Sequence, residues 1–263
     1  MLKKLLKYDF KNIFKVLVIF YGLSLFFAIL TRIFLNIENS FIMYVIGQIC
    51  NGCMISMLFN ILINNLMRLW ARFKQNFYGD ESYLTHTLPI DKKTLYLSKM
   101  LSTIITLFTS FLVIVLTIFI AYYSNDFLDI IKNMLFPITN AYNVNIVLII
   151  LAFTFILFLE FLNIVQVGYT GLILGHRKNN LKAWLSIVYG FIAMIISQLF
   201  VLSMIFVVAL FNKDILNLIF TNEMINIEST KIIIYMSIIL YIIVVVVCSF
   251  INIKLFDKGV DVD

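Results

Sequence analysis

Long apolar runs alternate with short polar segments along this chain, and the lengths of the runs predict a bundle of membrane-spanning helices. A helix needs about 20 mostly apolar residues to cross the hydrocarbon core of a bilayer. Six runs meet this requirement: Leu17–Leu35, Ile42–Met67, Ser98–Tyr123, Asn145–Leu174, Trp184–Phe211 and Ile232–Ile253. The pattern therefore predicts an all-α membrane protein in which residues 1–263 form one transmembrane domain.

The positions of the basic residues predict which side of the membrane each segment faces. The predicted outer side carries four of the 20 Lys and Arg residues: Arg32, Lys132, Lys213 and Lys231. Because Lys and Arg accumulate in cytoplasmic loops, we expect both termini and residues 72–97 to be cytoplasmic in a multi-pass protein of the cell membrane. This topology accounts for the net charge of +6, so the charge indicates no nucleic-acid partner.

The first 15 residues predict an amphipathic helix that lies in the membrane interface. Four lysines share one face of a helical wheel, and apolar side chains between Leu2 and Ile13 share the opposite face. Asp9 falls on the apolar face. Either the helix dipole or a nearby lysine stabilises this carboxylate, or the carboxylate contacts a partner or the charged segment 72–99. We favour the first explanation.

The composition is that of a membrane protein, and the absence of catalytic motifs argues against an enzyme. Charged residues make up 13% of the chain, whereas soluble domains contain about a quarter. The motifs HExxH, GxSxG and GxxxxGK[ST] do not occur in the sequence. We therefore expect no catalytic residues, no metal ligands and no cofactor in this chain, and we expect the lipid membrane to be its surroundings.

Polar residues inside the predicted spans are candidates for a path through the membrane. Glu160 shares a helix face with Asn163 and Thr170. Such a carboxylate either joins helices by hydrogen bonds or faces a cavity, and both alternatives stay open. In the second span, polar residues follow an i, i+4 ridge through Gly52, which indicates a helix that faces protein or water. The candidate pathway residues are Gln48, Asn60, Asn64, Glu160 and Asn163, and Ser56 lies on the same ridge.

A stripe of small side chains marks the fifth span. Its members are Ser186, Gly190, Ala193 and Ser197. Small residues let two helix backbones approach closely, so the stripe predicts tight packing, either within the chain or across a dimer.

Two polar segments resemble a known family. The segment RFKQNFYGDESYLTHTLPIDKKTLYLSK, Arg72–Lys99, and the N-terminal LLKYDFKNIFK are similar to the membrane subunits of type-2 ATP-binding-cassette transporters of Gram-positive bacteria. In that group, a segment of the form RFYKNLFGDEGYLTFTLPVS…LLSK follows the second span. The match covers Arg72, Phe73, Asn76, Phe77, Gly79, Asp80, Glu81, Tyr83, Leu84, Thr85, Thr87, Leu88, Pro89, Ser98 and Lys99. The chain departs from the pattern at Ser82 and His86.

The resemblance implies a six-span permease half that pairs with a second copy or a sister permease above two separate ATPase subunits. ATP and Mg would bind to those ATPases. Residues 72–97 would hold the coupling helix, beside the N-terminal interfacial helix. The expected ATPase-coupling residues are Phe77, Tyr78, Gly79, Asp80, Glu81, Tyr83, Leu84, Leu88 and Pro89. The aromatic members would fill grooves on the partner, and Asp80 and Glu81 would orient against its basic residues.

The expected function is that of the permease subunit of an ATP-driven exporter. It would couple ATP hydrolysis in the partner to movement of an amphipathic cargo such as a peptide or an antimicrobial. The alternative is a membrane-bound sensor or immunity protein that sequesters a peptide without transporting it.

Overall fold

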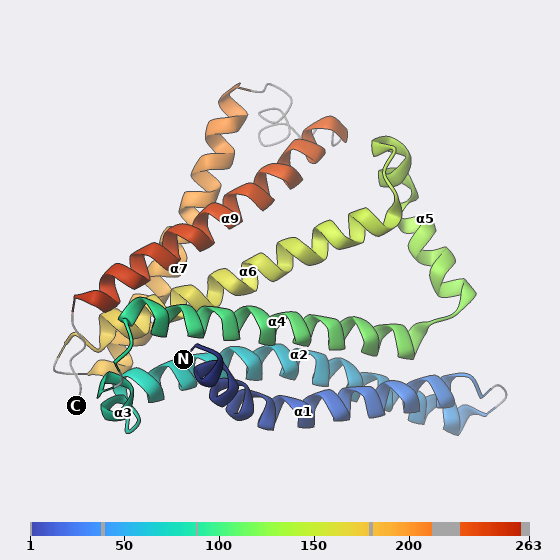
Figure 1. Cartoon of the computed structure of the whole chain (residues 1–263). Helices are drawn as coiled ribbons and strands as arrows, with labels where there is room; N and C mark the ends of the chain where they lie inside the picture. Colours follow the sequence, from blue (N-terminus) through green and yellow to red (C-terminus); the bar gives the residue numbers. More distant parts are fainter. Residues whose placement is uncertain (1, 38–39, 88, 179–180, 212–226, 259–263) are drawn as a thin grey trace. The chain divides into compact units, whose positions relative to one another are not determined.

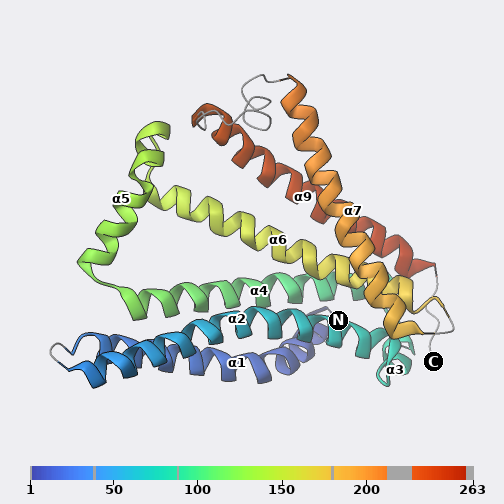
Figure 2. The same ribbon diagram turned by 180° about the vertical axis from the view of Figure 1, so that it is seen from behind.

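The computed structural model describes residues 2–37, 40–87, 89–178, 181–211 and 227–258, and helices make up nearly all of these ranges, with no strand among them. Figures 1 and 2 show the chain from opposite sides. The helices are α1 Leu2–Leu35, α2 Phe41–Tyr78, α3 Ser82–Thr87, α4 Lys92–Tyr122, α5 Asn125–Tyr142, α6 Ile146–Gly175, α7 Lys182–Phe211 and α9 Ile227–Asp257. The all-α prediction is confirmed for the described residues.

Six of these helices are long and apolar enough to cross a membrane: α1, α2, α4, α6, α7 and the part of α9 from Ile232 to Asp257. Each of them overlaps one predicted span, so the prediction of a multi-pass membrane protein is confirmed in its number of candidate spans. The reason is local, because an uninterrupted apolar run of this length satisfies its own backbone hydrogen bonds as a helix.

The first helix differs from the prediction. The sequence pattern predicted an interfacial helix over residues 1–15 and a separate span from Leu17, whereas the structure has one helix, α1, from Leu2 to Leu35. No Gly or Pro occurs near Lys15 to end a helix. At about 1.5 Å per residue, the 34 residues of α1 and the 38 of α2 span more than the ~30 Å hydrocarbon core.

The chain divides after Asp129, inside α5, into two compact units. In the first unit, α1 packs against α2 and α4, and the three helices run side by side in both views (Figures 1 and 2). Their interface is rich in hydroxyl and amide groups: the Tyr21 hydroxyl lies 2.7 Å from Ser110 Oγ, and Asn65 Nδ2 donates to Ser110 Oγ at 2.8 Å. Large apolar side chains such as Phe59 and Phe108 are exposed. Polar groups inside and apolar groups outside are typical of helices that pack in lipid.

In the second unit, α6 packs against both α7 and α9. The α6–α7 contact is close, because a Cβ added to Gly171 would lie 2.5 Å from Ser186 O and 2.7 Å from Gly190 Cα. A backbone contact this short leaves room for hydrogen only, so glycine is required at residue 171.

Candidate functional site

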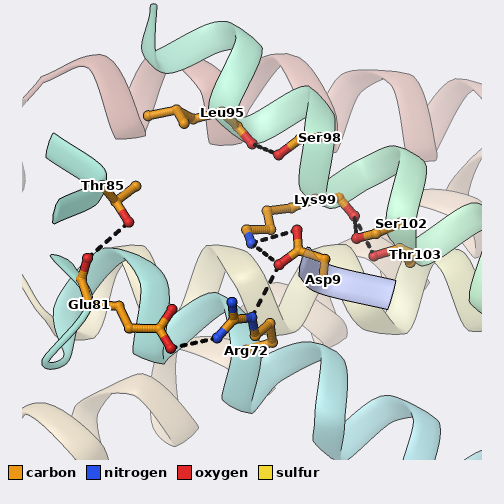
Figure 3. Close-up of polar contacts among 9 residues, drawn as sticks. All are labelled: Asp9, Arg72, Glu81, Thr85, Leu95, Ser98, Lys99, Ser102 and Thr103. Atoms are coloured by element: carbon orange, nitrogen blue, oxygen red, sulfur yellow. Dashed lines mark hydrogen bonds and ion pairs between the residues drawn. The ribbon is translucent and has the colours of Figure 1, made fainter. Parts of the chain in front are cut away.

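The strongest cluster of charged groups in the described residues joins four segments of the first unit (Figure 3). We call it the junction network and define it as Asp9, Arg72, Glu81 and Lys99. Lys99 Nζ lies 2.7 Å from both carboxylate oxygens of Asp9. Arg72 Nε donates to Asp9 Oδ1 at 3.1 Å, and Arg72 Nη1 donates to Glu81 Oε1 at 2.8 Å.

The inner part of the junction network is withdrawn from solvent. Asp9 is 1% exposed, and Lys99 is also buried. Two carboxylates face two cations, so the formal charges of the network cancel. Buried charges are tolerated when they are paired and hydrogen-bonded in this way, because the pairing offsets the lost hydration.

Helix periodicity explains how Asp9 reaches the interior. Asp9, Ile13 and Leu17 are spaced four residues apart on α1 and are all buried, so they form one stripe that faces the neighbouring helices. Arg72 approaches from the last two turns of α2, and Lys99 approaches from the second turn of α4.

Our favoured explanation of Asp9 was therefore wrong. The partners of its carboxylate are Arg72 and Lys99, which lie 63 and 90 residues away at the two ends of the charged segment, and not a lysine of its own helix. The alternative explanation, a contact with the charged segment, is the one that the structure shows. The signal in the sequence was an acid on an apolar face, which needs a hydrogen-bonding or charged partner when that face is buried.

Aromatic rings pack next to the inner ion pair. The ring centroids of Phe73 and Phe77 are 4.8 Å apart, those of Phe73 and Tyr96 are 6.5 Å apart, and Lys99 Nζ lies 5.7 Å from the centroid of Phe77. Phe77 and Tyr78 are buried. The expectation that these two rings contact an ATPase directly is therefore corrected: α2 continues as far as Tyr78 and packs Phe77 against α4 instead.

The exposed part of the charged segment is the short helix α3. Tyr83 is 66% exposed and Leu84 is 73% exposed, and the acidic residues Asp80 and Glu81 that precede the helix are also exposed. Gly79 ends α2 with its N–H bonded to Lys74 O at 3.1 Å. Pro89 is exposed and lies shortly before α4, whereas Leu88 falls outside the described residues. Among the expected coupling residues, Asp80, Glu81, Tyr83, Leu84 and Pro89 are accessible.

The polar ridge of α2 lies on the surface. Gln48 and Ser56 are exposed, and Asn60 and Asn64 are half-buried. Asn60 Nδ2 donates to Ser56 O and Asn64 Nδ2 donates to Asn60 O, both at 2.9 Å, so these amides bond to their own helix. The role of the ridge in a pathway stays a prediction.

The sequence pattern missed Asn65, which is buried and donates to Thr106 O at 3.0 Å.

Glu160 has a partner on another helix. Gln198 Nε2 of α7 donates to Glu160 Oε1 at 2.8 Å. Asn163 and Thr170, which share its helix face, bond elsewhere: Asn163 Nδ2 donates to Ser197 Oγ at 3.3 Å, and Thr170 Oγ1 donates to Asn252 Oδ1 at 2.7 Å. Glu160, Asn163 and Thr170 of α6 thus bond across to α7 or α9. The use of Glu160 and Asn163 by a cargo stays a prediction.

The small-residue stripe of α7 faces α6 over part of its length. Ser186 and Gly190 lie against Gly171, and Ser197 accepts the hydrogen bond of Asn163. Ala193 is half-buried. Packing within the unit, one of the two predicted roles, is what the structure shows, and a dimer contact at these positions stays a prediction.

Within the described ranges, no group of three His, Cys, Asp or Glu side chains is placed to hold a metal ion. The network is a set of ion pairs that connect α1, α2, α4 and the residue before α3. Comparison of the chain with protein-family models, with curated proteins and with solved structures finds no match.

Proposed function

We propose that this protein is the permease subunit of an ATP-driven exporter of the ATP-binding-cassette type. It would couple ATP hydrolysis in a separate ATPase subunit to movement of an amphipathic cargo, such as a peptide or an antimicrobial. A second copy or a sister permease would complete the membrane part. The observation that carries the proposal is an exposed short helix, α3, preceded by Glu81, whose ion pair with Arg72 of α2 leads on to the buried Asp9–Lys99 pair of α1 and α4.

A coupling element has to meet two physical requirements. It must present a surface that a soluble partner can grip, and it must be connected firmly enough to carry motion into the spans. The adjacent side chains of Tyr83 and Leu84 meet the first requirement, since an exposed aromatic and an aliphatic group suit a groove on a partner. Asp80 and Glu81 add charge that steers a basic surface into place. The junction network meets the second requirement.

The positive-inside distribution supports a cytoplasmic position for α3, where the ATPase and its nucleotide would be found. The resemblance of residues 72–99 to the coupling region of type-2 permeases supports the same partner. Both termini would then lie in the cytoplasm.

Copurification from native membranes tests the proposal. We expect an ATPase to copurify with the wild-type subunit and to be lost in the double variant Tyr83→Ala/Leu84→Ala. The matched control is Phe41→Ala/Ile42→Ala, an aromatic–aliphatic pair that is 81% and 68% exposed at the opposite end of α2. The control should retain the ATPase.

Two results would contradict the proposal. One is copurification that is equal in the wild type and in the Tyr83/Leu84 variant, which would remove α3 as the docking element. The other is the absence of any ATPase with the wild type, which would favour a peptide sensor or immunity protein.

A further inference from the structure

We propose that Asp9 positions the docking helix α3 through Arg72, so that a displacement of α3 is passed to the buried sides of α1 and α4. Asp9 is a positioning residue in this view, because it has no contact with the exposed face of α3. The inference rests on the proposed function for the identity of the partner that loads α3. The connection itself involves residues of the first unit alone.

Arg72 is the central link because it binds on two sides. Its Nε donates to Asp9 Oδ1 at 3.1 Å and its Nη1 donates to Glu81 Oε1 at 2.8 Å (Figure 3). The guanidinium group is planar and holds its donors in a fixed fork. The two carboxylates are therefore held in a fixed relation to each other, which a flexible lysine would not provide.

Glu81, which carries the outer carboxylate of the junction network, is attached to α3 through its backbone. Glu81 O accepts from Thr85 N at 3.0 Å and from Thr85 Oγ1 at 2.9 Å, which makes Glu81 part of the first turn of α3. Ser82, the next residue, is buried. A displacement of α3 therefore displaces Glu81, and the hydrogen bond between Glu81 Oε1 and Arg72 Nη1 transmits this displacement to Arg72.

The inner carboxylate is anchored from the opposite direction. Lys99 Nζ lies 2.7 Å from both oxygens of Asp9, and the aromatic ring of Phe77 flanks the ammonium group. Asp9 itself lies on the same buried stripe as Ile13 and Leu17. A pull on Asp9 is thus opposed by α4 and by the packed face of α1.

Exposure rises along the network from the anchor to the docking helix. The side chains of Asp9, Arg72 and Glu81 are 2%, 11% and 47% exposed. Ion pairs in solvent are weak and screened by salt, whereas buried pairs are difficult to separate. The inner pairs therefore act as the fixed end, and the Arg72–Glu81 pair is the joint that orients α3.

Distance measurement between two spin labels tests this connection in the full-length subunit without its partner. Labels are placed by Thr87→Cys on α3 and Lys11→Cys on α1, both exposed positions, after replacement of Cys50, Cys53 and Cys248. We expect a narrow distance distribution in this background and a broad one in Glu81→Gln and in Asp9→Asn. The thermal unfolding midpoint separates the two variants: it should be unchanged in Glu81→Gln and lowered in Asp9→Asn.

The matched control is Ile13→Ala, one turn along the same buried stripe. It should lower the unfolding midpoint and leave the distance distribution narrow, because the ion pairs stay intact. Arg72→Lys is the conservative variant. It keeps the charge next to Asp9 and loses the fork, so it should broaden the distribution while the midpoint falls less than in Asp9→Asn.

A distribution that stays narrow in both Glu81→Gln and Asp9→Asn would overturn the inference, as would an equal broadening in Ile13→Ala. Because both labels lie in this chain, the result is independent of the copurification experiment. A broadened Asp9→Asn variant in a protein that binds no ATPase would keep the connection and remove the proposed exporter function.

Discussion

The two units of this protein join their helices with different chemistry. In the first unit, charged side chains link α1, α2 and α4 through the buried carboxylate of Asp9. In the second unit, the links from α6 to α7 and α9 are mainly neutral amides and hydroxyls, such as Thr170 to Asn252 at 2.7 Å. The Glu160–Gln198 pair adds one carboxylate, with an amide and not a cation as its donor.

The position of each network along its helices explains this difference. Arg72 lies near the C-terminal end of α2 and Lys99 near the N-terminal end of α4, whereas Asn163 and Gln166 lie in the interior of α6. Placing a charge at the centre of a bilayer costs about 2.5–3.5 kcal/mol, and the cost falls toward the helix ends. Charged links therefore suit helix ends, where they can also reach a surface helix. Neutral links suit the interior, where they fix packing without burying a net charge.

The comparison predicts that loss of a charged link in the first unit lowers the unfolding midpoint more than loss of a link in the second unit. Lys99→Met keeps the length of the side chain and leaves Asp9 buried with Arg72 as its cation. Removing one partner of a buried ion pair typically costs about 3–5 kcal/mol, so we expect a large fall in the thermal unfolding midpoint of the purified protein. The control is Lys93→Met, an exposed lysine in the first turns of α4. If both variants unfold at the wild-type temperature, the junction network does not hold this unit together.

A steric change should affect the second unit next most strongly. Gly171→Ala places a methyl group 2.5 Å from Ser186 O, so α6 and α7 must move apart. Overpacking of this kind costs about 1–3 kcal/mol, measured as a lower unfolding midpoint. Gly190→Ala is the matched control, because a Cβ at Gly190 meets no atom within 4 Å. Equal midpoints for these two variants would mean that the close approach of α6 and α7 does not exist.

Loss of one neutral link should have a smaller effect. Thr170→Val preserves shape and removes the hydroxyl that donates to Asn252 Oδ1. Hydrogen bonds between membrane helices average about 0.6 kcal/mol, far less than a buried ion pair. We expect a small fall in the midpoint, which the Lys99→Met variant should exceed several-fold. A Thr170→Val effect as large as that of Lys99→Met would remove the contrast between the two units.

The sequence predicted the spans well and the networks poorly, for a physical reason. A span is a local property of some twenty consecutive residues, so hydropathy alone locates it. The partners of Asp9 lie 63 and 90 residues away, and no local sequence pattern identifies which cations bind it. The acid on an apolar face predicted that a partner was needed, without identifying it.

The aromatic residues illustrate the same limit. Phe77, Tyr78 and Tyr83 lie within seven residues of one another, yet the first two are buried and the third is exposed. An aromatic ring at a helix end has the same appearance in sequence whether it packs inward or faces a partner. Phe77 and Tyr78 are buried because α2 continues as far as Tyr78 and ends before Gly79. The end of a helix is harder to locate in a sequence than a long apolar run.

The smallest effect on stability is expected for Glu160→Gln. This variant tests whether Glu160 in the second unit only joins helices or also takes part in transport. Glutamine keeps the size of the side chain and keeps an oxygen that can accept the hydrogen bond from Gln198 Nε2, now 2.8 Å from Glu160 Oε1. If the carboxylate only joins α6 to α7, the unfolding midpoint, the copurification of the ATPase and cargo movement should all resemble those of the wild type. Glu160→Leu is the companion variant, since it removes the acceptor and should lower the midpoint through the unpaired Gln198 amide. We expect the structural role, because Glu160 Oε1 already accepts a hydrogen bond from α7 without a cargo. A Glu160→Gln protein that assembles, hydrolyses ATP and moves no cargo would instead place Glu160 in the transport pathway.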